Sequence, residues 1–518
     1  MPGTNRLFVD FCSGTAGNFL PFAGPGTDRP PLPPHWPELV HLVATQNPSP
    51  AAEDSVAALA AGAGTVLTGQ QVGLFGGPLY SPFKAATAIA RARTSTAKGH
   101  PHVGIFWLAS EDHDFAEISE VTFPAGKELA RLVYEGAPAS AIRAGKVVFG
   151  DAILPLAARA AELLGPSAAA DALVAAYKPG RTFAQAFGDF YAKILGPQGL
   201  LIVDASGREF HRLGAPVLRA AIERADEFFA ALEERSQALV AAGYHAQVSP
   251  ESSLLFLIDE HTGARLALRR IAPSAAEPNG LWMADDHTFS SADLQGILDA
   301  EPERISPAAL LRPVFQDFLF SSSAITGGPA EIAYWAQSAV LYDRILGRQT
   351  PILPRFSATL IEPSVAKLLH KHDLSLELVF AEESAASLSQ RLAARSMPVE
   401  TKQRLAAAGN ALDTELNALV EWMHAQDKGL GESAETAAGK MRYQMNRMRT
   451  LAANFQLQRE STLARHAESI YNAIFPGGIL QERVHGAAYY FARYGLELAD
   501  TLCAQAANDV PGHTAIWL

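Results

Sequence analysis

Three short apolar runs constrain the fold of this chain most. The runs GTVL, HVGIFWLAS and GLLIVDAS start at Gly64, His102 and Gly199, and each has an uncharged apolar centre. Strands that are apolar on both faces are typical of a parallel sheet covered by helices on both sides. The helical stretch SPFKAATAIARARTSTA separates the first two runs, and a spacing of roughly 35 residues suits one right-handed βαβ crossover. We therefore predict an α/β fold with a doubly wound parallel sheet.

Length and composition limit the class of protein. A chain of 518 residues exceeds what one hydrophobic core usually organises, so large insertions or further domains are expected. No apolar run approaches the roughly 20 residues of a membrane span, and the stretch MPGTNRLFVDFCSG lacks a secretory signal pattern. The net charge of −12 disfavours nucleic acid as a partner. Cys12 and Cys503 lack metal-ligand spacing. We expect a cytoplasmic protein that acts on small molecules, with no nucleic-acid or membrane partner.

Two segments interrupt the strand and helix alternation and are interpreted as insertions. Residues 121–180 contain VTFP, a candidate hairpin near ARLVYEG and GKVVFG, and then an alanine-rich helical stretch. In residues 235–305, LLFLIDE and ARLALRR flank HTG in a hairpin pattern. The segments 1–120, 181–234 and 306–390 are assigned to the core.

Residues 391–475 change to a heptad-like pattern. The apolar positions are Leu405, Leu412, Leu416, Leu419 and Met423, and then Met441, Met445, Met448 and Phe455. Gly429 and Gly431 between the two series are interpreted as helix stops, which predicts an antiparallel α-helical coiled coil. Two roles stay open for it, packing on the core or protruding as a dimerisation arm. The last segment, 476–518, is expected to dock back on the core.

The loop TGQQVGLFGGPLY follows the first predicted strand, at the edge of the sheet where ligands bind in this architecture. Its glycines permit close backbone approach to a ligand, and its glutamines offer both donors and acceptors. The next helix begins with free N–H groups, and Lys84 adds a charge that suits phosphate or carboxylate. The candidate ligand-binding residues here are Thr68, Gly69, Gln70, Gln71, Gly73, Gly76, Gly77 and Lys84. The alternative is a tight turn with solvated glutamines.

The second run ends in WLASEDHDF, where four titratable residues follow an apolar strand. His113 is a candidate proton acceptor, because its ordinary pKa of about 6.5 lies near neutrality. Asp112 or Asp114 would orient it or hold Mg²⁺. The alternative is a solvated turn in which Asp114 caps the next helix. No residue is assigned as a metal ligand.

A third set of candidates lies downstream, in LLRPVFQDFLFSSSAITGGPAEIAYWAQ and PILPRFSATLIEP. Arg312 and Gln316 share a helix face if their segment is helical. A glycine pair then opens another helix, and an alternating extended stretch follows it, suitable as a rim for an anionic group. The candidates in these two parts are Gly327, Gly328, Glu331, Tyr334, Arg355 and Ser357. Structural capping is the rival interpretation.

Taken together, these stretches resemble the bacillithiol biosynthesis cysteine-adding enzymes, the cysteine ligases of a bacterial low-molecular-weight thiol pathway. TGQQVGLFGGPLYSPFKA, FWLASEDHDFAEI, the two downstream stretches and the late ILQER carry the resemblance over nearly the whole chain. It implies a Rossmann-like core with connecting-peptide insertions, a coiled-coil domain and a homodimer. It also implies a reaction that joins L-cysteine to the amine of glucosaminyl malate. Carboxyl activation is expected to use ATP or another nucleotide, with Mg²⁺ as a companion ion.

On this interpretation His113, Asp112 and Gln71 are the candidate catalytic residues, and Arg312 and Arg355 would hold malate or phosphate oxygens. The other candidates named above would bind substrate or nucleotide. Two alternatives stay open. In the first, the chain is another amino-acid or nucleotidyl ligase. In the second, it is a binding protein that assembles partners of thiol synthesis without catalysis.

Overall fold

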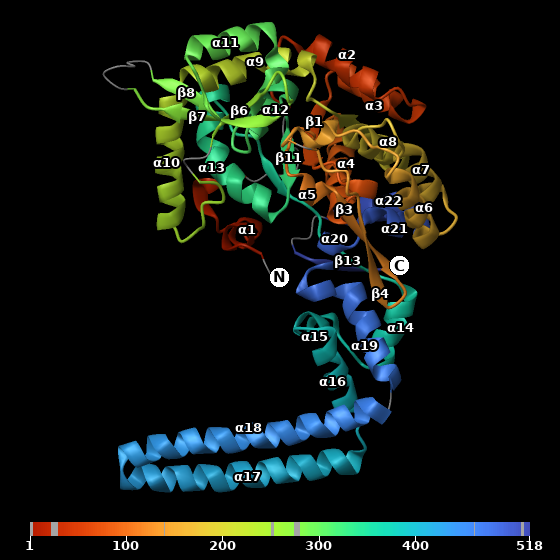
Figure 1. Ribbon diagram of the computed structural model, residues 1–518, viewed down its shortest axis with the longest axis vertical. Helices are drawn as coiled ribbons and strands as arrows, with labels where there is room; N and C mark the ends of the chain where they lie inside the picture. The colour runs from red at the N-terminus through yellow and green to blue at the C-terminus, as the bar shows by residue number, and fades with distance from the viewer. Residues whose placement is uncertain are drawn as a thin grey trace.

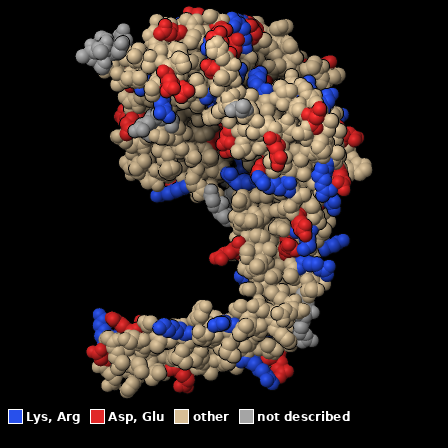
Figure 2. All heavy atoms as spheres, in the orientation of Figure 1, with Lys and Arg blue, Asp and Glu red and all other residues tan. Residues whose placement is uncertain are grey.

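The computed structural model describes residues 4–21, 29–138, 140–249, 253–273, 280–459, 461–508 and 512–518. Figure 1 shows a head that holds the two large sheets, a helical stalk below it, and a long arm that projects sideways from the stalk. The stalk comprises α14 (Pro363–Lys371), α15 (Leu376–Phe380), α16 (Ala385–Ser396) and α19 (Ser461–Ile474), and the arm comprises α17 (Val399–Gln426) and α18 (Lys428–Arg459). An open space separates the underside of the head from the arm (Figure 2).

A five-stranded parallel sheet forms the centre of the head. Its strands are β1 (Gly64–Gln70), β2 (His102–Leu108), β5 (Leu200–Val203), β11 (Ala324–Gly327) and β12 (Ile352–Pro354). They lie in the order β12, β11, β1, β2, β5, and every neighbouring pair is parallel. The predicted α/β parallel core is therefore confirmed. The chain builds outward on one side of β1 and then crosses to build on the other, so the topological switch point lies between β1 and β11.

Helices cover both faces of this sheet because alternate strand residues enter two separate cores. On β2, Ile105 and Trp107 enter one core, whereas Phe106 and Leu108 enter the other. The first core is covered by α1 (Arg6–Cys12), α2 (Trp36–Gln46), α3 (Glu53–Ala60), α9 (Arg208–Glu223), α10 (Ala225–Ala241), α12 (Arg312–Phe320) and α13 (Pro329–Leu346). The second is covered by α4 (Tyr80–Ala97), α6 (Ile153–Leu164), α7 (Ala168–Ala176), α8 (Phe183–Leu195), α21 (Ala487–Tyr494) and α22 (Leu498–Ala506).

Two antiparallel units interrupt the parallel core. After α5 (Phe115–Ile118), β3 (Glu120–Ala125) pairs with β4 (Glu128–Val133) through a tight turn in which Gly126 has φ of 69°. ARLVYEG therefore pairs with VTFP, and GKVVFG contributes only an isolated bridge from Val148. The second unit contains β6 (Leu255–Ile258), β7 (Arg265–Ile271), β8 (Leu281–Ala284), β9 (His287–Phe289), α11 (Ser291–Ala300) and β10 (Ile305–Pro307). Pairing of β6 with β7 confirms the predicted hairpin around HTG.

The arm is an antiparallel pair of helices, which confirms the predicted coiled coil. The prediction that Gly429 and Gly431 stop a helix was wrong, because both lie inside α18. Asp427 alone separates the helices, and its carboxylate accepts a hydrogen bond from the Leu430 N–H at 3.0 Å, as an N-cap does. A Cβ at Gly431 would lie 2.0 Å from the His424 ring, so this glycine lets the two helices approach closely.

The heptad series divides between two faces of the arm. Leu416 and Met445 are buried between the helices, whereas Leu419, Met441 and Met448 are exposed. The inner set forms the seam of the helical pair. The outer set leaves apolar side chains on the surface.

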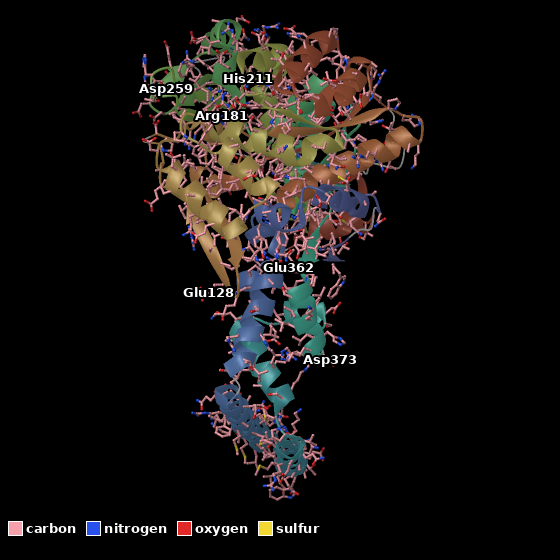
Figure 3. The ribbon with its side chains drawn as sticks, turned by 90° about the vertical axis from the view of Figure 1, so that its right-hand side faces the viewer. Glu128, Arg181, His211, Asp259, Glu362 and Asp373 are labelled. Atoms are coloured by element: carbon pink, nitrogen blue, oxygen red, sulfur yellow. The ribbon has the colours of Figure 1, made fainter. Side chains whose placement is uncertain are left out.

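The chain returns from the stalk to the head through α20 (Gln481–Val484), α21 and α22. The last strand, β14 (Thr514–Trp517), pairs in parallel with β13 (Ala358–Ile361). Figure 3 labels Glu362 where the head meets the stalk, and its carboxylate pairs with Arg493 at 2.7 Å. Among the described residues, no helix combines the length and apolarity that crossing a bilayer requires.

Candidate functional site

A cavity of about 230 Å³ opens at the switch point of the parallel sheet. Its wall comes from the carboxyl end of β1, the first turns of α4, α12 and α13, and the end of β12. The structure brings eleven predicted residues to this wall: Gly69, Gln70, Gln71, Lys84, Asp112, Arg312, Gln316, Gly328, Glu331, Tyr334 and Arg355. The wall also contains Tyr80 and Arg483. Segments far apart in sequence therefore meet at one polar cavity, as the topology predicts.

Lys84 ties two sides of the cavity together. Its ammonium group donates to the Gly69 carbonyl at 2.6 Å and to Gln70 Oε1 at 2.8 Å, and it pairs with Glu331 at 2.7 Å. Burial lowers the pKa of Lys84, although the negative charge of Glu331 acts to raise it. Glu331 also accepts the Gly328 N–H at 2.8 Å and so caps α13. All three ammonium protons have partners within the protein, so Lys84 orders the wall and adds little free positive charge.

Arg355 is held by a carboxylate from the C-terminal segment. Glu482, on α20, pairs with Arg355 at 2.5 Å and also accepts hydrogen bonds from the Ser357 hydroxyl and the Ala358 N–H. Burial opposes ionisation of Glu482, but the Arg355 charge outweighs it and lowers the pKa of this carboxyl. Arg355 also lies over the Tyr80 ring at 5.4 Å. The Arg355 guanidinium is therefore fixed in direction and largely neutralised.

Two other guanidinium groups at the cavity have no ion-pair partner of this kind, although the more distant charges of Asp112 and Glu331 act on one of them, Arg312. Arg312 hydrogen-bonds Tyr334, and Arg483 lines the wall near Tyr80. In the part of the chain that the structure describes, neither group forms an ion pair with a carboxylate. An excess of positive charge in a partly enclosed cavity attracts anionic ligands, and guanidinium binds carboxylate or phosphate through two parallel hydrogen bonds.

Asp112 and Gln71 form a polar pair in the lining of the same cavity. The Gln71 amide donates to Asp112 Oδ2 at 3.1 Å. Burial opposes ionisation of Asp112, but Arg312 and Arg265 outweigh it, so the pKa of this carboxyl is lowered. Asp112 therefore stays ionised across the neutral range. A carboxylate of this kind is better suited to orient an ammonium group than to remove a proton from it.

His113 and Asp114 lie outside the cavity. The His113 ring is 41% exposed, and it lies against Phe256 and near the Arg265 guanidinium, at 3.4 Å, on the side of the antiparallel sheet. Asp114 caps α5 by accepting the Glu117 N–H at 3.3 Å, which is the structural alternative considered from the sequence. Neither side chain lines the cavity, although His113 Nδ1 lies 3.9 Å from Oδ1 of Asp112, which does.

The glycine loop does not cradle an anion as the sequence suggested. The N–H groups of Gly73, Gly76 and Gly77 are bonded to the Gln71 carbonyl, the Tyr177 hydroxyl and the Leu74 carbonyl. A Cβ at Gly76, where φ is 86°, would lie 2.6 Å from the Phe190 ring. These glycines let the loop pack against buried aromatic side chains. Their N–H groups already donate hydrogen bonds within the protein and are not free to bind phosphate.

The remaining candidates, Thr68, Gly327 and Ser357, make contacts within the fold and do not line the cavity. The Thr68 hydroxyl donates to the Thr326 carbonyl at 3.2 Å inside the sheet. Gly327 packs under Trp335, where a Cβ would lie 2.4 Å from the indole ring. Ser357 is buried between Glu482 and the His513 ring, whose Nδ1 lies 2.7 Å from its hydroxyl. Of the alternating rim predicted around residue 355, only Arg355 itself reaches the cavity.

Sequence reasoning missed Tyr80, Glu482 and Arg483. All three lie in stretches that carry the family resemblance, Tyr80 at the end of the glycine loop and the other two in ILQER. That placement was the available signal. Within the described ranges, no group of three or more His, Cys, Asp or Glu side chains is placed to hold a metal ion.

Two models of one protein family together match most of this chain. Residues 38–356 match the family described as "Bacillithiol biosynthesis BshC, N-terminal Rossmann-like domain", and residues 358–517 match its "C-terminal coiled-coil domain". Three similar relatives each carry the name "Putative cysteine ligase BshC". The one from Koribacter versatilis (strain Ellin345) is 42% identical over 474 residues, which cover 90% of this chain and 86% of the relative. That from Solibacter usitatus (strain Ellin6076) is 32% identical, with 96% and 94% covered, and that from Salinibacter ruber (strain DSM 13855 / M31) is 31% identical, with 87% and 82% covered.

Proposed function

Because the chain belongs to the bacillithiol biosynthesis BshC family, we propose that its switch-point cavity joins the carboxyl group of L-cysteine to the amine of glucosaminyl malate. The chain is an enzyme, a cysteine ligase of bacillithiol biosynthesis that forms an amide bond. The two substrates and the route of activation are the parts that we propose. The sequence-based expectation of a cytoplasmic enzyme forms part of the same proposal.

The guanidinium group of Arg312, which forms no ion pair among the described residues, is the observation that carries this proposal. The malate portion of glucosaminyl malate bears carboxylates, which need cationic partners when they leave water. Arg355, fixed by Glu482, supplies a second guanidinium to the same cavity. Asp112, kept ionised, would orient the glucosamine nitrogen in the same cavity. The cavity thus pairs with both ends of that substrate.

We further propose that a nucleotide activates the cysteine carboxyl group. A carboxylate is a poor electrophile, and ATP or another nucleotide would supply the leaving group that amide formation needs. The glycine-loop N–H groups are already bonded within the protein, so they do not fit a phosphate. Arg483 has the donor chemistry for phosphate oxygens. A Mg²⁺ ion would accompany the phosphates.

The arm is proposed to join two copies of the chain. Trp422 and Leu419 on α17 and Met441 and Met448 on α18 are exposed, with relative accessibilities of 57%, 49%, 49% and 58%. Met441 and Met448 are seven residues apart, so they share one helix face. The helical pair has already filled its own seam. A second arm packed on these outer residues would complete a bundle with apolar contacts on both sides.

Thiol measurement in cells tests the proposed reaction. A strain of a bacillithiol-producing bacterium that lacks its own member of this family should accumulate glucosaminyl malate, and this chain should restore bacillithiol, as measured by mass spectrometry. The Arg312→Met and Gln71→Ala variants should restore much less, whereas Arg159→Met, an exposed change on α6, should restore it fully. Full restoration by folded Arg312→Met and Gln71→Ala proteins would favour a non-catalytic assembly role.

A further inference from the structure

A second cavity, of about 330 Å³, lies beside the first. It is bounded by the glycine loop, α5, β3 and α20. Gln70, Gln71, Tyr80 and Arg483 line both cavities, so these side chains form the boundary between them. Two adjacent chambers with a shared wall suit an enzyme that brings two different substrates together.

The second chamber carries one carboxylate and one guanidinium that the protein does not pair with each other. Glu117, on α5, receives a hydrogen bond from the Gln71 amide, and within the described residues no cation forms an ion pair with it. Arg483 is likewise without an ion pair there. Glu120 also lines the chamber, but Arg131 on the neighbouring strand already neutralises it. One free charge of each sign therefore remains.

Part of the lining of this chamber is apolar. Pro78, Ile118, Val121 and Val484 contribute to its lining. Ile118 and Val121 are buried at 2% and 5%, so the hydrophobic core holds them in place. A short side chain can pack on this surface while charged groups at its α-carbon reach the rim.

We propose that the second chamber is the subsite for a free α-amino acid, which is L-cysteine if the proposed function holds. An α-amino acid is a zwitterion, and each of its charges needs a partner of opposite sign. Glu117 binds the α-ammonium group, and Arg483 binds the α-carboxylate. Because Arg483 also lines the first cavity, the carboxylate is held at the shared wall, facing the chamber assigned to the amine substrate.

The charge balance of the two chambers also supports placing the amino acid in the second chamber. The first cavity has an excess of guanidinium, which disfavours a group that keeps a positive charge throughout the reaction. The α-ammonium group of cysteine is such a group, because only the carboxyl group reacts. The second chamber offers Glu117 to it. The charges of the two chambers therefore favour the dicarboxylate in the first and the amino acid in the second.

Calorimetric titration with three probes tests the subsite in the full-length protein. The probes are L-cysteine, cysteamine, which lacks the carboxylate, and 3-mercaptopropionate, which lacks the ammonium group. The unchanged protein should bind L-cysteine at least about tenfold more tightly than either analogue, since a charge-assisted hydrogen bond contributes about 1.5–3 kcal/mol. Glu117→Gln should abolish the preference over 3-mercaptopropionate, and Arg483→Met the preference over cysteamine.

The matched control is Glu128→Gln, a change on β4 at the lower tip of the β3 and β4 hairpin (Figure 3), where the side chain is 72% exposed. It should leave all three affinities unchanged. No measurable cysteine binding by the unchanged protein, or unaltered preferences in both cavity variants, would overturn the subsite. Bacillithiol restored in cells by those same variants would leave the proposed function standing, whereas no restoration by the unchanged protein would remove the function itself.

Discussion

The Glu111 side chain shows how a single charged residue is accommodated beneath the site. It follows β2 directly, is 6% exposed, and faces the buried His211 ring at 3.2 Å. The other ring nitrogen of His211 lies 2.9 Å from the Ile305 carbonyl of β10. Burial alone would raise the pKa of Glu111, but His211 and Arg265 outweigh it and lower this pKa to about 2. The carboxylate therefore links the parallel core to the antiparallel unit.

This lowered pKa predicts a defined acid dependence. The ionised Glu111 stabilises the folded state fully above its ordinary pKa of 4.5, and that contribution is lost as the pH falls toward 2. Its size is about 3 kcal/mol from the change in pKa. The free energy of unfolding of Glu111→Gln should fall below that of the unchanged protein at pH 7, and the gap should narrow between pH 4.5 and 2. A gap that stays constant over this range would contradict the assignment. Glu128→Gln is the exposed control.

Among single residues, the sequence predicted those whose partners lie nearby in the chain. Arg312 and Gln316 lie four residues apart on one helix, and both line the cavity as expected. The partners of Arg355 and Glu111 could not be predicted, because Glu482 is 127 residues from Arg355 and His211 is on a separate helix. Such pairs form only when the tertiary fold brings distant segments together, and no local pattern encodes them.

The glycine loop is the element whose role changed most between sequence and structure. Gly73, Gly76 and Gly77 suggested a phosphate cradle, but glycine spacing alone does not show whether an N–H group faces a ligand or the core. The Tyr177 hydroxyl donates to the Gly73 carbonyl and accepts the Gly76 N–H, both at 2.9 Å. Tyr177 is more than 100 residues downstream, on the chain after α7, so the loop sequence does not reveal it.

Tyr177→Phe tests this role of the loop. The change removes only the hydroxyl from a side chain that is 1% exposed, and leaves the Gly76 N–H buried without an acceptor. We expect the free energy of unfolding to fall by about 1–3 kcal/mol in urea denaturation, because a buried unsatisfied donor keeps its desolvation cost. A variant as stable as the unchanged protein would show that the hydroxyl does not hold the loop.

For the whole molecule, the sequence predicted the classes of structure better than their boundaries. Apolar runs and heptads are properties of a segment, so the parallel core and the coiled coil were both recognisable. The division into seven segments stays a prediction. The stalk shows why boundaries are harder, because α14 to α16 and α19 share one core although the whole arm separates them in sequence.

Dimerisation through the arm is a prediction at this scale. Trp422→Glu combined with Met448→Glu places charges on the outer face of the arm and spares the seam residues Leu416 and Met445. We expect the unchanged chain to sediment as a dimer and the double variant as a monomer, with the same helix content by circular dichroism, because buried unpaired charge disfavours the interface. Equal sedimentation of both proteins would contradict an arm-mediated dimer.

We propose that arginine binds the anionic substrate at the switch point between β1 and β11. Calorimetric titration of glucosaminyl malate into the unchanged protein, Arg312→Met and Arg159→Met measures this binding. We expect binding by Arg312→Met to be at least about tenfold weaker, because a charged hydrogen bond is lost, and binding by Arg159→Met to be unchanged. Equal affinity of all three proteins for glucosaminyl malate would contradict it.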